Sequence, residues 1–168
     1  SKPSVRSSIP EGFEKAALTH GFNVRVATKA ERRENIDYVV WRTEKGEVKD
    51  VAAIAVKKTI VRQAKKRKEL WGWIEFRDRF GNPGWLFSKC TFLAFKRQKE
   101  FLLLSKGDFR RWVESGIIDW TSLAATWWDA RYRIFRRKGT KEEIAQFKLN
   151  HAIRKCRHYK WPIDDEST

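Results

Sequence analysis

The chain has 168 residues, 41% of them hydrophobic, which is enough for one folded domain with a core and a small appendage. No apolar run approaches the length of a membrane-spanning helix and no signal-peptide core stands near the N-terminus, so we expect a soluble, intracellular (cytoplasmic) protein without a membrane partner. The net charge of +16 indicates a polyanionic partner, because Lys and Arg side chains that bind phosphates release counterions. Basic and aromatic residues are interleaved along the whole chain, which favours nucleic acid over an anionic membrane surface.

The first part of the chain predicts a tail, a helix and a strand. Residues 1–9 are small, polar and basic, which is typical of a mobile tail. Residues 10–20 predict a short helix, because a proline stands near its start, apolar residues recur on one side and a glycine follows its end. Residues 22–26 alternate apolar and polar side chains as a strand does, and residues 27–35 are expected to form a charged loop.

Two further strands, at residues 37–41 and 51–57, are predicted to form a hairpin across a glycine-containing turn. Side chains alternate between the two faces of a strand, so Ala55 and Lys57 are expected to share one face. Asp37 stands at the start of the first strand. The hairpin is therefore predicted to bring an acid, a lysine and an alanine into one neighbourhood.

A basic run follows the hairpin between residues 59 and 68. A loop or a helix there would track a phosphate backbone, although a charge run also forms an ordinary solvated face. The basic residues proposed to bind nucleic acid in this run are Arg62, Lys65, Lys66, Arg67 and Lys68. Further along, strands are predicted at 70–76, 85–87, 91–95 and 101–104, a turn at 80–84 and a helix at 106–114.

The C-terminal third changes character and predicts a pair of helices. Residues 122–138 carry aromatic side chains at helical spacing and end in a basic stretch, which we expect to grip phosphates. A second helix is predicted from Thr140, where Thr-Lys-Glu-Glu forms a capping box. The pair would pack on the sheet or form a dimer surface. The phosphate-gripping residues of the first helix would be Arg131, Arg133, Arg136 and Arg137.

Several other catalytic and metal-binding patterns are absent from the sequence. Cys90 and Cys156 stand far apart, with no His or Cys at zinc-ligand spacing, so we expect two buried, reduced thiols. The three histidines do not cluster, and there is no Ser-His-Asp set or glycine-rich phosphate loop. Most of the nine tryptophans are expected in the core, Trp85, Trp112 and Trp120 among them, while Trp71, Trp73 or Trp161 would instead stack on an unpaired base.

The hairpin carries most of what a metal-dependent nuclease needs. Hydrolysis of a phosphodiester with Mg²⁺ uses carboxylates from separate strands, because Mg²⁺ prefers oxygen ligands. The ion lowers the pKa of its bound water, and a nearby lysine neutralises the developing negative charge. Asp37 and Lys57 fit this pattern, and Ala55 stands where the second acid would be.

In these residues the sequence resembles the PD-(D/E)xK nuclease superfamily, which includes restriction endonucleases, archaeal Holliday-junction resolvases and small nucleases of phages and mobile elements. The resemblance covers residues 10–113 and lies in the order of elements: a helix with an acid, a strand, the hairpin and a later strand with an acid. It implies that Asp37 is a metal ligand and Lys57 the catalytic lysine, with Glu14 and Glu75 as accessory residues. It also implies a Mg²⁺ (or Mn²⁺) cofactor and a DNA substrate, duplex or branched.

The sequence departs from this family at Ala55, which occupies the second metal-ligand position, and mildly at Ile36, where the family has a proline. Three explanations are open. An acid was deliberately replaced to trap uncleaved nucleic acid, or the chain is a natural pseudonuclease that only binds, or the acid comes from elsewhere. We discount Glu47, although Glu-Val-Lys49 also spells acid-x-Lys, because it directly follows a turn; Asp50 is a weaker substitute.

Each of these residues also has a purely structural interpretation. Asp37 would satisfy a loop backbone or pair with an arginine, and Lys57 would be solvated at a strand end. Glu75 would pair across the sheet, and Glu14 would lie on a helix surface. Their joint occurrence in the expected order is what favours the nuclease.

We therefore expect an α/β fold, with a mixed central sheet flanked by helices as in restriction endonucleases at residues 10–118 and a helical extension at 119–168. The expected function is that of a Mg²⁺-dependent DNA endonuclease, working as a homodimer where two strands are cut, which Ala55 leaves inactive or impaired. The alternatives are a natural, catalytically silent nucleic-acid-binding protein on the same fold and an RNA-binding protein unrelated to nucleases.

Overall fold

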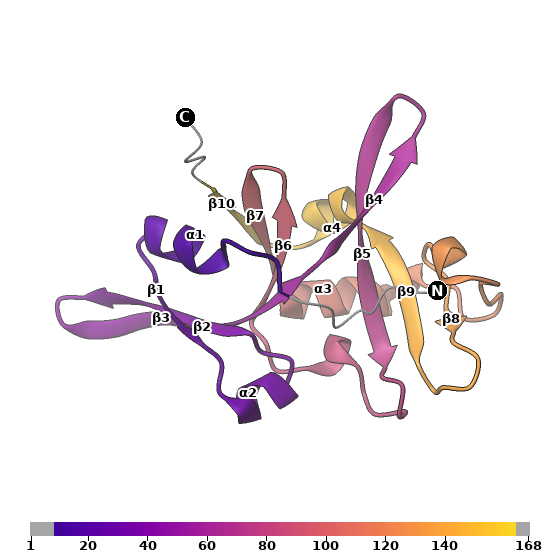
Figure 1. Cartoon of the computed structure of the whole chain (residues 1–168), viewed down its shortest axis with the longest axis horizontal. Helices are drawn as coiled ribbons and strands as arrows, with labels where there is room; N and C mark the ends of the chain where they lie inside the picture. The colour runs from indigo at the N-terminus through magenta and orange to yellow at the C-terminus, as the bar shows by residue number, and fades with distance from the viewer. Residues whose placement is uncertain (1–8, 164–168) are drawn as a thin grey trace. The chain divides into compact units, whose positions relative to one another are not determined.

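The computed structural model describes residues 9–163, so the predicted tail lies outside the described residues except for Ile9. The described chain forms two compact units whose segments alternate along the sequence, with the elements labelled in Figure 1. The six-stranded unit consists of residues 9–57, 89–106 and 157–163, and the four-stranded unit consists of residues 58–88 and 107–156. The chain passes from one unit to the other after residues 57, 88, 106 and 156, and the domain boundary predicted after residue 118 is not one of these points.

The six-stranded unit holds a mixed sheet with the order β1-β2-β3-β6-β7-β10. Neighbouring strands are antiparallel except for β3 and β6, which run parallel. A mixed sheet accompanied by helices confirms the α/β class expected from the sequence. The strands are β1 Asn23–Val26, β2 Tyr38–Glu44, β3 Glu47–Lys57, β6 Phe92–Arg97, β7 Glu100–Ser105 and β10 His158–Pro162.

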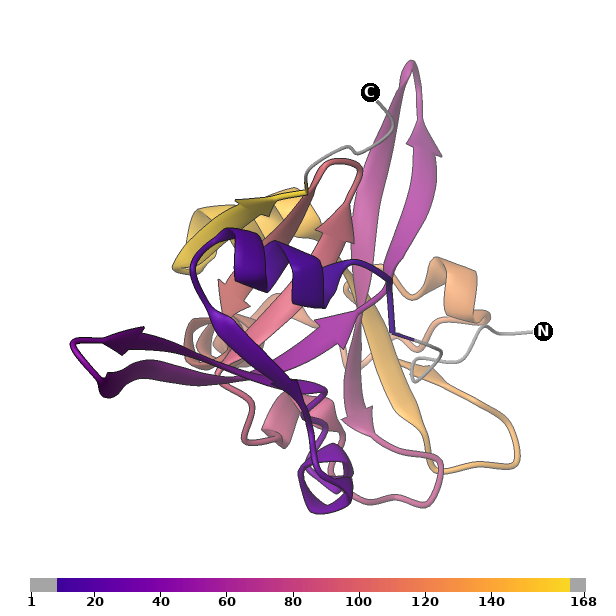
Figure 2. The ribbon, with the colours of Figure 1, turned by 60° about the vertical axis from the view of Figure 1, so that its left-hand side comes forward.

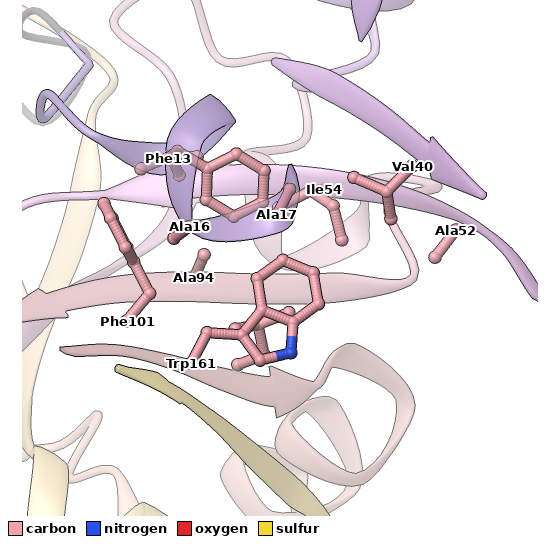
Figure 3. Close-up of a cluster of buried hydrophobic side chains, with 11 residues drawn as sticks. Phe13, Ala16, Ala17, Val40, Ala52, Ile54, Ala94, Phe101 and Trp161 are labelled. Atoms are coloured by element: carbon pink, nitrogen blue, oxygen red, sulfur yellow. The ribbon is translucent and has the colours of Figure 1, made fainter. Parts of the chain in front are cut away.

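Helix α1, Phe13–Thr19, lies on one face of this sheet (Figure 2). Phe13, Ala16 and Ala17 recur at helical spacing and are all buried, so the helix turns one apolar side toward the strands. Figure 3 shows these side chains gathered with Trp161 of β10, and the rings of Phe13 and Trp161 lie 5.7 Å apart. The helix predicted here is confirmed, and its core joins segments from opposite ends of the described chain.

A second short helix, α2 at Lys29–Arg33, stands where residues 27–35 were expected to form a charged loop. The Thr28 hydroxyl accepts a hydrogen bond from the Glu31 N–H at 3.2 Å, and the Glu31 carboxylate accepts one from the Thr28 N–H at 2.8 Å. This reciprocal pair satisfies two of the free N–H groups at the helix start. The Thr-x-x-Glu spacing signals such a cap, and the loop prediction was wrong because it weighed only the charges.

Strands β2 and β3 form the predicted hairpin. Its base is the pair Tyr38 and Ile54, and its tip is the pair Glu44 and Glu47. A register shift between Val40 and Arg42 marks a β-bulge, which separates the regular base from the exposed tip. The end of β3 that carries Ala55 and Lys57 pairs with β6 in a regular parallel ladder, just beyond Ile54, the last residue that pairs with β2.

The four-stranded unit holds an antiparallel sheet with the order β4-β5-β9-β8. The basic run, where a loop or helix was expected, is part of the long hairpin of β4 and β5 (Figure 1). Its turn is formed by Lys65 and Lys66, and Lys65 has a positive φ of 51°. The strands are β4 Thr59–Ala64, β5 Arg67–Arg77, β8 Phe135–Arg136 and β9 Glu143–Lys148.

The core of the four-stranded unit is aromatic. Phe109 of α3 is fully buried, and its ring lies 5.9 Å from that of Trp85 and 4.8 Å from that of Phe147. Helix α3 confirms the prediction of a helix from residue 106, whereas the strand predicted at 85–87 is a 3₁₀ turn. The helices and turns are η1 Trp85–Phe87, α3 Lys106–Trp112, η2 Val113–Ile117, η3 Trp127–Asp129 and α4 Leu149–Lys155.

The predicted C-terminal helical pair is wrong. Between residues 122 and 138 the chain forms the short turn η3 and the strand β8, and Tyr132 has a φ of 54°, which a right-handed helix excludes. The second helix was also misplaced, because residues 143–148 form β9 and α4 begins only at Leu149. β9 lies between two strands and is buried almost throughout, so its polar and apolar residues do not alternate with the period of a half-exposed strand.

Two other expectations concern the cysteines and the membrane. Cys90 and Cys156 are buried free thiols, as predicted. Burial, assisted by the charge of Asp108, raises the pKa of Cys156 to about 12, so its reactive thiolate form is scarce at neutral pH. None of the helices within residues 9–163 is both long and apolar enough to cross a bilayer.

Candidate functional site

The end of β3 positions the centre of the candidate site in the six-stranded unit. Asp37 immediately precedes β2, and its carboxylate Oδ2 accepts a hydrogen bond of 2.7 Å from the N–H of Val56. The Asp37 N–H in turn donates to the carbonyl oxygen of Ile54 at 2.8 Å. These two bonds fix the carboxylate beside the backbone that joins Ala55 to Lys57. The structure therefore brings Asp37, Ala55 and Lys57 together.

Positive charges surround the Asp37 carboxyl group. Burial raises its pKa, while the hydrogen bond from Val56 and the charges of Lys57 and Arg32 act in the opposite direction. Arg32 belongs to α2, the helix that was expected to be a loop. The half-buried acid and two nearby cations form a site that can hold an anionic group such as a phosphate. Arg32 is a member of the site that sequence reasoning missed.

Glu14 reaches the same neighbourhood through a tyrosine. It lies in the first turn of α1, and its negative charge acts on the hydroxyl group of Tyr38, the first residue of β2. Burial raises the pKa of Tyr38, and the negative charges of Glu14 and Asp37 raise it further. Glu14 thus stands one side chain away from Asp37, and Tyr38 is a second residue that the sequence did not single out.

The residues present do not fit a Mg²⁺ or Mn²⁺ site. Ala55 is fully buried and offers no oxygen. Within the part of the chain that the structure describes, no three His, Cys, Asp or Glu side chains are grouped so as to hold a metal ion. Of the two other acids considered, the discounted Glu47 is exposed at the hairpin tip, and the weaker substitute Asp50 pairs with Arg42 at 3.1 Å. A single carboxylate remains beside the lysine.

Glu75 has a different setting from the one expected. It lies on β5 of the four-stranded unit, is almost completely buried, and accepts a hydrogen bond of 3.3 Å from the Trp85 N–H through Oε1. That bond ties η1 to the strand. Glu75 therefore has a structural role within the four-stranded unit, whereas Asp37 and Lys57 belong to the six-stranded unit.

Arg62, the first basic residue of the β4–β5 hairpin, is buried and fully engaged. Its guanidinium donates to the Trp128 carbonyl at 2.7 Å and to Gln146 Oε1 at 3.0 Å, and it lies 3.9 Å from the centre of the Trp128 ring. Burial lowers its pKa. Arg62 therefore stabilises the fold and is withdrawn from phosphate binding. The exposed basic residues at and beside the turn of this hairpin are Lys65, Lys66, Arg67 and Lys68.

The four C-terminal arginines do not share one helix face, because the predicted helix is absent. Arg133 donates to the Ser122 and Leu123 carbonyls, at 3.0 and 3.1 Å, and so fastens a loop. Arg136 pairs with Glu143 in the sheet, whereas Arg131 and Arg137 are exposed. Of the four, Arg133 is mainly structural.

A change of protonation state at Asp37 is expected to alter stability. The pKa of Asp37 in the folded state is raised above its ordinary value of 3.8. The protonated acid therefore contributes to folding stability fully below pH 3.8, and this contribution is lost as the pH rises through the pKa of the folded state. Asp37→Asn keeps an oxygen to accept from Val56 but never ionises. We expect the variant to have a higher free energy of unfolding than the parent at pH 7, with the difference vanishing at acidic pH.

Urea unfolding across this pH range measures the effect, with Asp50→Asn, an exposed acid in a surface ion pair, as the matched control. A loss of stability in Asp37→Asn at pH 7 would show that Lys57 and Arg32 outweigh burial.

Four of the five residues named for the nuclease-like site, Glu14, Asp37, Ala55 and Lys57, lie together in one unit. They join two carboxylates, a lysine and a buried methyl group. Comparison of the chain with protein-family models, curated proteins and solved structures finds no match.

Proposed function

We propose that this chain is a nucleic-acid-binding protein built on a nuclease-like core, in which Ala55 leaves a Mg²⁺-dependent DNA endonuclease site inactive or impaired. The observation that carries the proposal is the hydrogen bond from Val56 to Asp37, which holds an acid beside the Ala-Val-Lys segment. The net charge of +16 supports a polyanionic partner.

In this proposal the residues divide into a cationic part and an acidic part. Lys57 and Arg32 attract and neutralise a backbone phosphate, and both act on the charge of Asp37 already. Asp37 and Glu14 lie on either side of Tyr38 as the acidic part. The methyl group of Ala55 supplies neither charge nor a ligand oxygen, so the chain binds the phosphate without the means to cut it.

The test is to restore an acid at position 55. We expect Ala55→Glu or Ala55→Asp to nick supercoiled plasmid or branched DNA in the presence of Mg²⁺ or Mn²⁺, at a rate at least about 100-fold above the parent. Ala55→Gln and Ala55→Asn are matched controls of the same shapes without charge. Adding Asp37→Ala to the active variant should abolish nicking again.

Position 55 is fully buried, so each variant is first checked by thermal unfolding, and Glu and Asp offer two side-chain lengths. No cleavage by any folded variant, together with salt-sensitive binding by all of them, would leave the natural, catalytically silent binding protein as the better description. Preference for RNA over duplex and branched DNA would favour the RNA-binding alternative. The homodimer stays a prediction, which sedimentation of the chain with and without DNA measures.

A further inference from the structure

Three neighbouring strands of the four-stranded unit place one arginine on each side of a glutamate. Glu143 of β9 pairs with Arg77 of β5 on one side and with Arg136 of β8 on the other. Its Oε1 lies 3.1 Å from Arg77 Nε, and its Oε2 lies 2.8 Å from Arg136 Nε. The glutamate is buried, while the two arginine side chains are 59% and 51% exposed. This Arg–Glu–Arg row has one positive charge in excess and presents both guanidinium groups to solvent.

The row forms part of a groove of about 750 Å³. Aromatic rings line the groove beside the arginines: Trp120 and Phe87 are 45% and 40% exposed, and the buried Phe76 supports Trp120 at a ring distance of 4.9 Å. The volume lies within the usual range of ligand sites. Proteins bind single-stranded nucleic acids with exposed aromatic rings next to cations, because bases stack on the rings and phosphates pair with the cations.

The segments around the groove are held in place by their own hydrogen bonds. Asp78 Oδ1 accepts from the N–H groups of Phe80 and Asn82, both at 2.9 Å, and so fastens the turn after β5. Asp119 Oδ1 accepts from the N–H groups of Thr121 and Ser122, at 2.8 and 3.1 Å, which fixes the loop carrying Trp120. The groove is therefore preorganised, and binding does not have to order these loops.

More positive charge adjoins the groove. The Lys141 N–H donates to the Arg79 carbonyl at 3.1 Å, so the two exposed basic residues are carried by segments tied to each other. Lys141 lies directly against Gly81, where an added Cβ would come within 2.8 Å of its side chain. The described residues of this unit include 19 Lys and Arg against 9 Asp and Glu, which favours a polyanion.

We infer that this groove binds a single-stranded stretch of nucleic acid, with Arg77 and Arg136 on a backbone phosphate and Trp120 and Phe87 against unpaired bases. A duplex is the poorer ligand, because its bases are already stacked on each other and cannot lie on the rings. The site lies in the four-stranded unit and goes beyond the function proposed for Asp37 and Lys57, which belong to the six-stranded unit.

The experiment measures fluorescence anisotropy of a labelled thymidine oligonucleotide and of a labelled duplex with the full chain at several salt concentrations. We expect Trp120→Ala to weaken single-strand binding about 5- to 150-fold, the effect of losing one stacked base, and Trp120→Phe to retain most of the affinity. Arg77→Ala with Arg136→Ala should flatten the salt dependence, lowering the slope of log K against log salt by about 0.7 for each phosphate that the variant no longer neutralises. Arg154→Ala, an exposed arginine of α4 outside the groove, is the matched control.

Thermal unfolding identifies variants that fail to fold. If Trp120→Ala is one of them, Trp120→Phe, which retains a ring, still tests the site. Unchanged single-strand affinity in the folded variants would overturn the inference. Equal losses of affinity for the duplex and for the single strand would overturn it too. So would displacement of the oligonucleotide by polyglutamate to the same extent with and without Trp120, because the groove would then recognise charge alone. Groove-dependent single-strand binding by a chain that neither binds duplex nor gains cleavage at position 55 would support this inference while removing the proposed function.

Discussion

Gly84→Ala is expected to destabilise the four-stranded unit by about 3 kcal/mol or more, a larger cost than ordinary overpacking brings. A Cβ at this position would stand 2.2 Å from the carbonyl oxygen of Glu75 and 2.5 Å from its carbonyl carbon. These are backbone atoms of a central strand, so they cannot yield as a flexible side chain would. The Gly84 N–H also donates to the Phe76 carbonyl at 2.9 Å, which keeps the loop against β5. Relief would require η1 to move and Trp85 to leave the core.

The measurement is the free energy of unfolding in urea, with Gly107→Ala as the matched control. Gly107 lies in helix α3, and an added Cβ there would meet only the Arg111 guanidinium nitrogens, the nearer at 3.6 Å. Alanine is the better helix former, so this control should be neutral or gain about 0.5–1 kcal/mol. The same chemical change is thus expected to act with opposite sign at two places in one unit. Equal stabilities of the two variants would contradict the close approach at Gly84.

Phe13→Ala is expected to cost about 3–5 kcal/mol, a large part of the stability of an ordinary domain. The ring is buried and lies 5.0 Å from the ring of Tyr38, 5.4 Å from that of Phe101 and 5.7 Å from that of Trp161. Removing it leaves a cavity between α1 and strands that come from three parts of the chain. The loss should also loosen the neighbouring Glu14.

Urea unfolding again provides the measurement, with Leu18→Ala as the control on the same helix. Leu18 is 60% exposed, so its truncation should change the free energy of unfolding by less than about 0.5 kcal/mol. A comparable loss in both variants would contradict the burial of Phe13 as the source of its cost, and helix propensity could not explain it because alanine is the better helix former.

The local pattern of the sequence was sufficient for α1 and for the hairpin of β2 and β3. In both, one face is buried and the other is not, so apolar residues recur with the period of the element. The position of Ala55 and Lys57 on one face follows from the same alternation. The Val56–Asp37 hydrogen bond could not be foreseen, because it depends on where the chain enters β2.

The prediction for the C-terminal third was wrong for the opposite reason. Strand β9 is buried from Glu143 to Phe147, so polar and apolar residues do not alternate along it. The aromatic spacing between residues 122 and 138 matched a helix, yet Tyr132 adopts a positive φ and its N–H bonds the Gln146 carbonyl at 2.8 Å. Long-range contacts of this kind decide the structure of a segment and leave no local trace.

For the candidate site, the sequence predicted the residues on the hairpin and misjudged those from elsewhere. Arg32 was overlooked because its helix was taken for a loop, although the Thr28–Glu31 cap announced it. Glu75 was included because its strand follows in the expected order, but its carboxylate serves the Trp85 backbone. The order of elements along a chain does not reveal which compact unit each element joins.

The alternation of segments between the two units determines when each unit can fold during synthesis. The core beneath α1 cannot close before the ribosome has added Trp161, although Phe13 emerges far earlier. Until then the edge of β7 has no partner strand and the Trp161 side of the core beneath α1 is open, and both are aggregation-prone surfaces. Contacts between such distant residues also slow folding. A nascent chain stalled before β10 is therefore a substrate for chaperones and proteases, and neither unit can be obtained by expressing one continuous fragment.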